Sequence, residues 1–129
     1  MKIKSFEKYY IADDEGNSGC VVRTFCKLYD KQYSDVVCEL SKIAKEKNFH
    51  SYNEPEVFEE YMRRHNTFPI EFSDKIRVRE LDLEKGSYVI HCSDGLDWNH
   101  LIPFINGVAY DKSEDCLNLN VMKIYQKKY

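Results

Sequence analysis

The sequence predicts an α+β fold in which N-terminal helices pack on a C-terminal antiparallel sheet. Between Cys20 and Met62 the apolar residues recur at helical spacing. From Gly86 onward the chain is rich in β-forming residues, and Asn106-Gly107 is its strongest signal for a two-residue hairpin turn. A run of helices followed by a run of strands is typical of the α+β class.

The composition indicates one domain spanning residues 1–129. Hydrophobic residues make up 43% of the chain and charged residues 32%, which is ordinary for a globular protein. The formal net charge of −3 provides no electrostatic reason to expect binding to nucleic acid or to anionic membranes. Residues 1–16 lack an apolar h-region, and no later stretch approaches the length of a membrane span. We therefore expect a cytoplasmic protein.

The helical half divides into three segments. Residues 20–29 form the first expected helix. Ser34 is expected to cap the second helix, and Asn53 the third, because Pro55 suits a first turn and Glu56 completes a capping box with Asn53. The buried faces of the second and third helices are expected to consist of Val36, Val37, Leu40, Ile43 and Ala44, and of Val57, Phe58, Tyr61 and Met62.

The second half contains the expected strands. Residues 76–81 are ambiguous between a short helix and a strand, whereas 87–92 and 121–125 are best interpreted as strands. The turn at Asn106-Gly107 pairs residues 100–105 with 108–111. Pro103 lacks an N–H group, which predicts that its strand is at an edge or bulged there.

Cys20 is the candidate nucleophile. It follows a turn-forming stretch, Gly16 to Gly19, and opens the first helix, where the positive end of the helix dipole favours a thiolate over a thiol. The five cysteines are irregularly spaced and contain no CxxC motif, which indicates neither a disulfide framework nor a zinc knuckle. We therefore expect no metal and no cofactor.

A cysteine nucleophile needs a base and a group that orients the base. His91 lies inside an expected strand on the same face as Val89, which is typical of a core residue. His100 lies where a polar loop becomes a strand, and the hairpin brings it near Asp111, with the register uncertain by one residue. Composition alone offers many such triples, so the residues themselves leave Cys20, His100 and Asp111 as one hypothesis among several.

Two runs of sequence carry a wider pattern, SGCVVRTFCKLYDKQYSDVVCELSKIAKEKN and KGSYVIHCSDGLDWNHLIPFINGVAYD. A glycine-containing turn and a cysteine open the first helix, and a Gly-x-Tyr-Val-Ile strand comes later. A histidine-led strand, an Asn-Gly hairpin and an aspartate follow it. From about residue 16 to 115 this order resembles the small papain-like cysteine peptidase domains of bacteria and their phages.

The resemblance implies a papain-like fold, a protein or peptide substrate, and roles for three residues. Cys20 would be the nucleophile, His100 the base and Asp111 the orienting acid. Papain-like enzymes place an oxyanion-stabilising glutamine about six residues before the cysteine, where this chain has Asp14. Asn17 is the nearby amide that could replace it, together with the backbone N–H of Cys20.

Trp98 and Asn99, which directly precede His100, are candidates for lining a substrate cleft. Trp98 either packs in the core or a loop, or it shields the base or lines the cleft, as aromatic residues near the base do in similar enzymes. Asn99 stands where many small relatives have a glycine.

Three classes of function remain open. The first is a thiol hydrolase or acyltransferase acting on a peptide, amide or isopeptide bond. The second is a papain-fold interaction protein, phage- or plasmid-encoded and directed at a host protein, which would use residues 93–97 and 111–116 as contact surfaces. The third is a metal site, which the sequence disfavours because His91 and Cys92 point to opposite faces of a strand.

Overall fold

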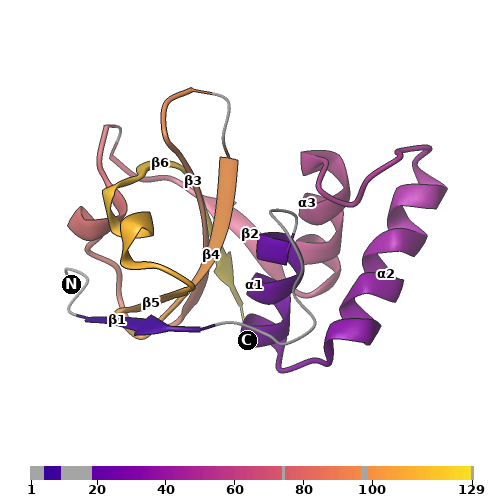
Figure 1. The fold of residues 1–129 in the computed structure, drawn as a ribbon, viewed down its shortest axis with the longest axis horizontal. Coiled ribbons are helices and arrows are strands. Elements are labelled where there is room, and N and C mark those ends of the chain that lie inside the picture. Colours follow the sequence, from indigo (N-terminus) through magenta and orange to yellow (C-terminus); the bar gives the residue numbers. More distant parts are fainter. Residues whose placement is uncertain (1–4, 10–18, 74, 97–98, 129) are drawn as a thin grey trace.

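The computed structural model describes residues 5–9, 19–73, 75–96 and 99–128 (Figure 1). Within these residues the helices are α1 (Gly19–Tyr29), α2 (Tyr33–Glu46) and α3 (Pro55–Arg64), with short 3₁₀ turns η1 (Val78–Glu80) and η2 (Glu114–Asn118). The strands are β1 (Ser5–Lys8), β2 (Thr67–Ile70), β3 (Ser87–Ser93), β4 (Asn99–Ile105), β5 (Val108–Asp111) and β6 (Asn120–Lys127).

The strands form one mixed sheet in the order β1-β5-β4-β3-β6-β2. The prediction of an antiparallel sheet is correct for the four other pairings but wrong for β1, which runs parallel to β5. The predicted order of helices followed by strands is also incomplete, because β1 precedes the helices. A parallel pair needs a long connection, and here all three helices lie in the chain between β1 and β5. The α+β class is confirmed.

The helices gather on one side of the sheet, and the two 3₁₀ turns lie on the other (Figure 1). Each predicted helix is present, but both predicted caps are wrong. Gln32 is the N-cap of α2, because the helix already includes Tyr33 and Ser34, and Glu54 rather than Asn53 is the N-cap of α3. The ambiguous segment 76–81 contains the 3₁₀ turn η1.

The alternation of side chains along the central strands produces two cores. Val89 of β3 and Leu101 of β4 pack with the helices, while Ile90 and Ile102 pack in a second core with residues of η1 and η2. Both faces of the sheet are therefore covered. This explains why the described part of β3 is apolar or buried at nearly every position.

The hairpin predicted at Asn106-Gly107 is present and pairs Ile105 with Val108. Both turn residues have positive φ, 50° for Asn106 and 84° for Gly107, as the favoured two-residue hairpin turn requires. Pro103 was predicted to mark an edge strand or a bulge, and both alternatives are wrong. β4 lies between β3 and β5, and its pairing with β3 runs through Pro103 without a shift of register. The described β4–β5 ladder covers only Phe104 and Ile105, so the proline lies beyond it.

Candidate active site

Cys20 is the second residue of α1, and its side chain lies in the core between the helices and the sheet. The residue is 9% exposed. Its backbone N–H belongs to the first turn of the helix, whose N–H groups have no acceptor within the helix. The thiol is therefore at the positive end of the helix dipole, as the sequence predicts.

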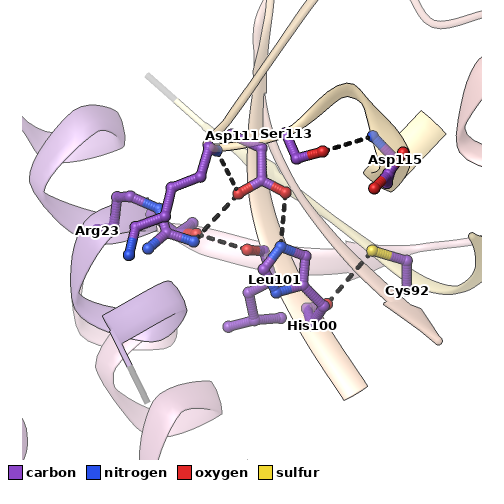
Figure 2. Close-up of polar contacts among 9 residues, drawn as sticks. Arg23, Cys92, His100, Leu101, Asp111, Ser113 and Asp115 are labelled. Carbon is purple, nitrogen blue, oxygen red and sulfur yellow. Dashed lines mark hydrogen bonds and ion pairs between the residues drawn. The ribbon is translucent and has the colours of Figure 1, made fainter. Parts of the chain in front are cut away.

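His100 and Asp111 are in direct contact across the hairpin. His100 Nε2 lies 2.7 Å from Asp111 Oδ2, and both side chains are 7% exposed (Figure 2). His100 is the second residue of β4 and Asp111 is the last residue of β5, so the hairpin places the two side chains together. With Nε2 directed at the carboxylate, Nδ1 is the ring nitrogen left for a second partner.

That second partner is Cys20. Burial alone would raise the pKa of the Cys20 thiol, but its hydrogen bond to His100 and the charge of His100 lower that pKa below the ordinary value. Burial would lower the pKa of His100, but its hydrogen bonds to Asp111 and Cys20 raise it to about 9. Opposite shifts of this kind favour a thiolate beside an imidazolium at neutral pH.

Asp111 is held from several directions besides His100. Arg23 Nη2 donates to Asp111 Oδ1 at 3.1 Å, and the backbone N–H of Lys112 donates to the same oxygen at 2.8 Å (Figure 2). The Cys116 thiol is also a hydrogen-bond partner of the carboxyl group, and burial together with this carboxylate raises the pKa of Cys116. Burial would raise the pKa of Asp111, but the bond to His100 and the other contacts lower it. The carboxylate is therefore charged at neutral pH.

Helix α1 is joined to β4 beside the site. Thr24 Oγ1 donates to the carbonyl oxygen of Leu101 at 3.0 Å, and both residues are buried. The backbone N–H of Leu101 in turn bonds to the sulfur of Cys20 and lowers its pKa. These two contacts fix the helix that carries the thiol against the strand that carries the imidazole.

Of the other predicted site residues, Asn99 is described by the structure, whereas Asn17 and Trp98 are not. Asn99 is exposed at the start of β4, and its Oδ1 lies 3.1 Å from Nε2 of His91. His91 itself lies on the helix side of the sheet, with its ring centroid 6.1 Å from that of Phe58, and it is not part of the Cys20–His100–Asp111 group. Asn17 and Trp98 lie outside the described residues.

Sequence reasoning did not identify Arg23 and Cys116 as site residues. A signal for Arg23 was available, because it is a charged residue within the otherwise largely apolar run Val21 to Leu28 and lies three positions after Cys20. Cys116 had no comparable signal, since a buried cysteine is ordinarily a small apolar residue of the core.

Neither a metal centre nor a membrane span is found in the described part of the chain. No group of three or more histidine, cysteine, aspartate or glutamate side chains there could hold a metal ion. No helix there combines the length and the apolar character needed to cross a membrane.

The chain was compared with protein-family models, with curated proteins and with solved structures, and none of the three comparisons produced a match.

Proposed function

We propose that the protein is a papain-like thiol enzyme, a hydrolase or acyltransferase that acts on a peptide, amide or isopeptide bond through Cys20, His100 and Asp111. One observation carries the proposal. A thiol at a helix N-terminus hydrogen-bonds an imidazole whose Nε2 lies 2.7 Å from a buried carboxylate. Nucleophile, base and orienting acid in mutual contact are the arrangement that cysteine acyl transfer requires.

In the proposed reaction the Cys20 thiolate attacks the carbonyl carbon of the substrate and forms a tetrahedral intermediate. His100, protonated beside the thiolate, donates its proton to the leaving amine as the carbon–nitrogen bond breaks. The resulting thioester is then attacked by water or by a second amine, with His100 accepting the proton of that nucleophile; the carbon–sulfur bond breaks, which releases the acyl product and restores the Cys20 thiolate beside the protonated His100. Hydrolysis and transfer differ only in this last nucleophile.

The tetrahedral intermediate also needs donors for its oxyanion. The N–H groups of the first turn of α1, including that of Cys20, have no acceptor within the helix and could donate to the oxyanion. The helix dipole also favours negative charge at this end. Asn17 remains the proposed side-chain donor.

A second candidate is the interaction protein that keeps this fold and binds a partner without turnover. The observation that favours it is the low exposure of the site, since Cys20 is 9% and His100 is 7% exposed. A carbonyl group must reach the sulfur for catalysis, whereas a partner that binds elsewhere needs no such access.

Competition among the cysteines for a limiting amount of iodoacetamide at near-neutral pH tests the enzyme proposal. Cys38 is exposed, whereas Cys20, Cys26, Cys92 and Cys116 are buried. Accessibility alone therefore predicts that Cys38 is labelled first. We expect Cys20 to be labelled fastest, because its thiolate fraction exceeds that of an ordinary thiol.

The control is His100→Ala, in which Cys20 loses its partner and its labelling should fall behind that of Cys38. Fastest labelling of Cys38 or Cys116 in the wild type would contradict the proposed thiolate and favour the interaction protein. A peptidyl electrophile in place of iodoacetamide then reports whether a peptide-sized group reaches the sulfur.

A further inference from the structure

Arg23 is a charged residue buried inside the protein, beside the candidate site. It is 4% exposed and lies three residues after Cys20 in α1. Its guanidinium Nη2 lies 3.1 Å from Oδ1 of Asp111, and the two side chains are 5% and 7% exposed. Figure 2 shows Arg23 extending from α1 toward the carboxylate, on the other side of which His100 lies.

The charges of the site balance only when Arg23 is included. A thiolate at Cys20, an imidazolium at His100 and a carboxylate at Asp111 sum to one negative charge, and the guanidinium of Arg23 neutralises it. A buried charge without a partner is costly, and a carboxylate in that position is driven toward its neutral form.

Two lysines also lie near Asp111, but Arg23 is buried and its guanidinium bonds the carboxylate directly. Lys112 contributes a backbone N–H, and Lys8 lies opposite Asp111 in the β1–β5 register but is itself exposed. The titratable or charged groups around the carboxylate on the neighbouring elements are Arg23 and Cys20 on α1, His100 on β4, Cys92 on β3, Cys116 on η2 and Lys8 on β1.

We propose that Arg23 is a positioning residue of this site: by binding Oδ1 of Asp111 it keeps the carboxylate charged, with Oδ2 directed at Nε2 of His100. The inference rests on the proposed function, because it assigns Arg23 a role in preparing the Cys20–His100 pair. Arg23 acts through Asp111, and its guanidinium also favours the thiolate at Cys20 by its charge.

A purely structural role would have a different signature. Thr24, the next residue of α1, already joins the helix to β4 through Leu101. If Arg23 only filled space or held the helix in place, its replacement would lower stability without changing the pH at which Cys20 becomes reactive.

The test measures the alkylation rate of Cys20 by iodoacetamide as a function of pH in folded protein. Arg23→Gln removes the charge but can still donate a hydrogen bond to Asp111. We expect it to move the acid limb of the profile upward by about one pH unit, the size of shift that a lost neighbouring charge produces. Arg23→Lys keeps the charge and should leave the acid limb close to that of the wild type.

Lys27→Gln is the matched control, because it removes one positive charge from the same helix while Lys27 contacts the rings of Tyr9 and Tyr110, and its profile should follow the wild type. Arg23→Gln is also measured in the Asp111→Asn background. There the effect of Arg23→Gln should be smaller, since the carboxylate through which Arg23 acts is gone.

The outcomes separate this inference from the proposed function. A wild-type profile with an ordinary thiol pKa contradicts both. A wild type with a lowered Cys20 pKa, matched by a superimposable Arg23→Gln profile, overturns the positioning role and leaves the enzyme proposal standing. If Arg23→Gln does not fold, Arg23→Met, which also removes the charge, is measured in its place: an acid limb moved upward by about one pH unit supports the inference, and a limb that coincides with that of the wild type overturns it.

Discussion

Asp111 connects the two cations of the site, because one carboxylate oxygen faces His100 and the other faces Arg23. Asp111→Asn should therefore have two effects. The amide can select the wrong tautomer of His100, so Cys20 should lose reactivity by about tenfold for each pKa unit that its thiol gains. The buried guanidinium of Arg23 also loses its charged partner, which should reduce the free energy of unfolding by about 1–3 kcal/mol.

These effects are measured by the pH dependence of Cys20 alkylation and by urea unfolding. His100→Ala is the comparison, and it should raise the pKa of Cys20 further because the partner itself is removed. Superimposable alkylation profiles for the wild type and both variants would show that Cys20 is an ordinary thiol.

At the residue scale, the candidate nucleophile, base and acid were easier to predict from sequence than the buried cation that pairs with the acid. A helix start and a hairpin turn are local signals that made Cys20, His100 and Asp111 candidates, and the resemblance to papain-like domains gave them their proposed roles. The pairing of Arg23 with Asp111 joins residues 88 positions apart and depends on how α1 docks on the sheet. No local pattern contains that information.

At the element scale, the β4–β5 hairpin determines where Asp111 lies relative to His100. Gly107 has a φ of 84°, a conformation that an L-residue with a Cβ adopts at a cost. Gly107→Ala should therefore lower the free energy of unfolding by about 1–2 kcal/mol. Gly107→Asn should cost less, because asparagine tolerates positive φ.

Urea unfolding of the two variants measures the difference, and equal losses would contradict the role assigned to backbone conformation. The alkylation profile of Cys20 should be unchanged in both variants whenever the protein is folded, since the turn lies at the opposite end of β4 from His100.

The elements also show where sequence patterns were insufficient. The helical segments and the hairpin were predicted because apolar spacing and turn residues specify them locally. The short edge strands β1 and β2 were not predicted, because each has four residues and its partner lies far away in the chain. Such strands are formed by nonlocal pairing rather than by their own sequence.

At the scale of the whole molecule, the Cys20–His100 pair influences how folding stability depends on pH. The pKa of His100 is raised from 6.5 to about 9 in the fold, so its stabilisation is complete below pH 6.5 and is lost as the pH rises through 9. The pKa of Cys20 is lowered from 9.0, so its stabilisation is present above pH 9.0 and is lost as the pH falls through the folded-state value. At a pH above the folded-state pKa of Cys20 and below about 9, the folded pair holds one proton, as the unfolded pair does between about pH 6.5 and 9.0.

We therefore expect this pair to make the free energy of unfolding nearly independent of pH in the interval that ends at about pH 9 and begins at pH 6.5 or at the lowered Cys20 pKa, whichever is higher. In Cys20→Ala the imidazole titrates beside Asp111 without the thiolate, and stability should fall as the pH rises over this interval. The difference between wild type and variant should grow by up to about 1.4 kcal/mol per pH unit. Urea unfolding at several pH values measures it, and a difference that stays constant with pH would contradict the ion pair.

From the residues alone, Cys20, His100 and Asp111 were one hypothesis among several, and their proposed roles came from the resemblance to papain-like domains. The sequence did determine the α+β class, the three helical segments and the central hairpin. These follow from periodicity and turn conformation, which act over a few residues. The tertiary structure decided that the sheet is mixed, that β4 is central, and that Arg23 and Cys116 meet at Asp111. Those features depend on which faces of distant elements pack together, and the free energy of that packing belongs to the assembled core rather than to any one segment.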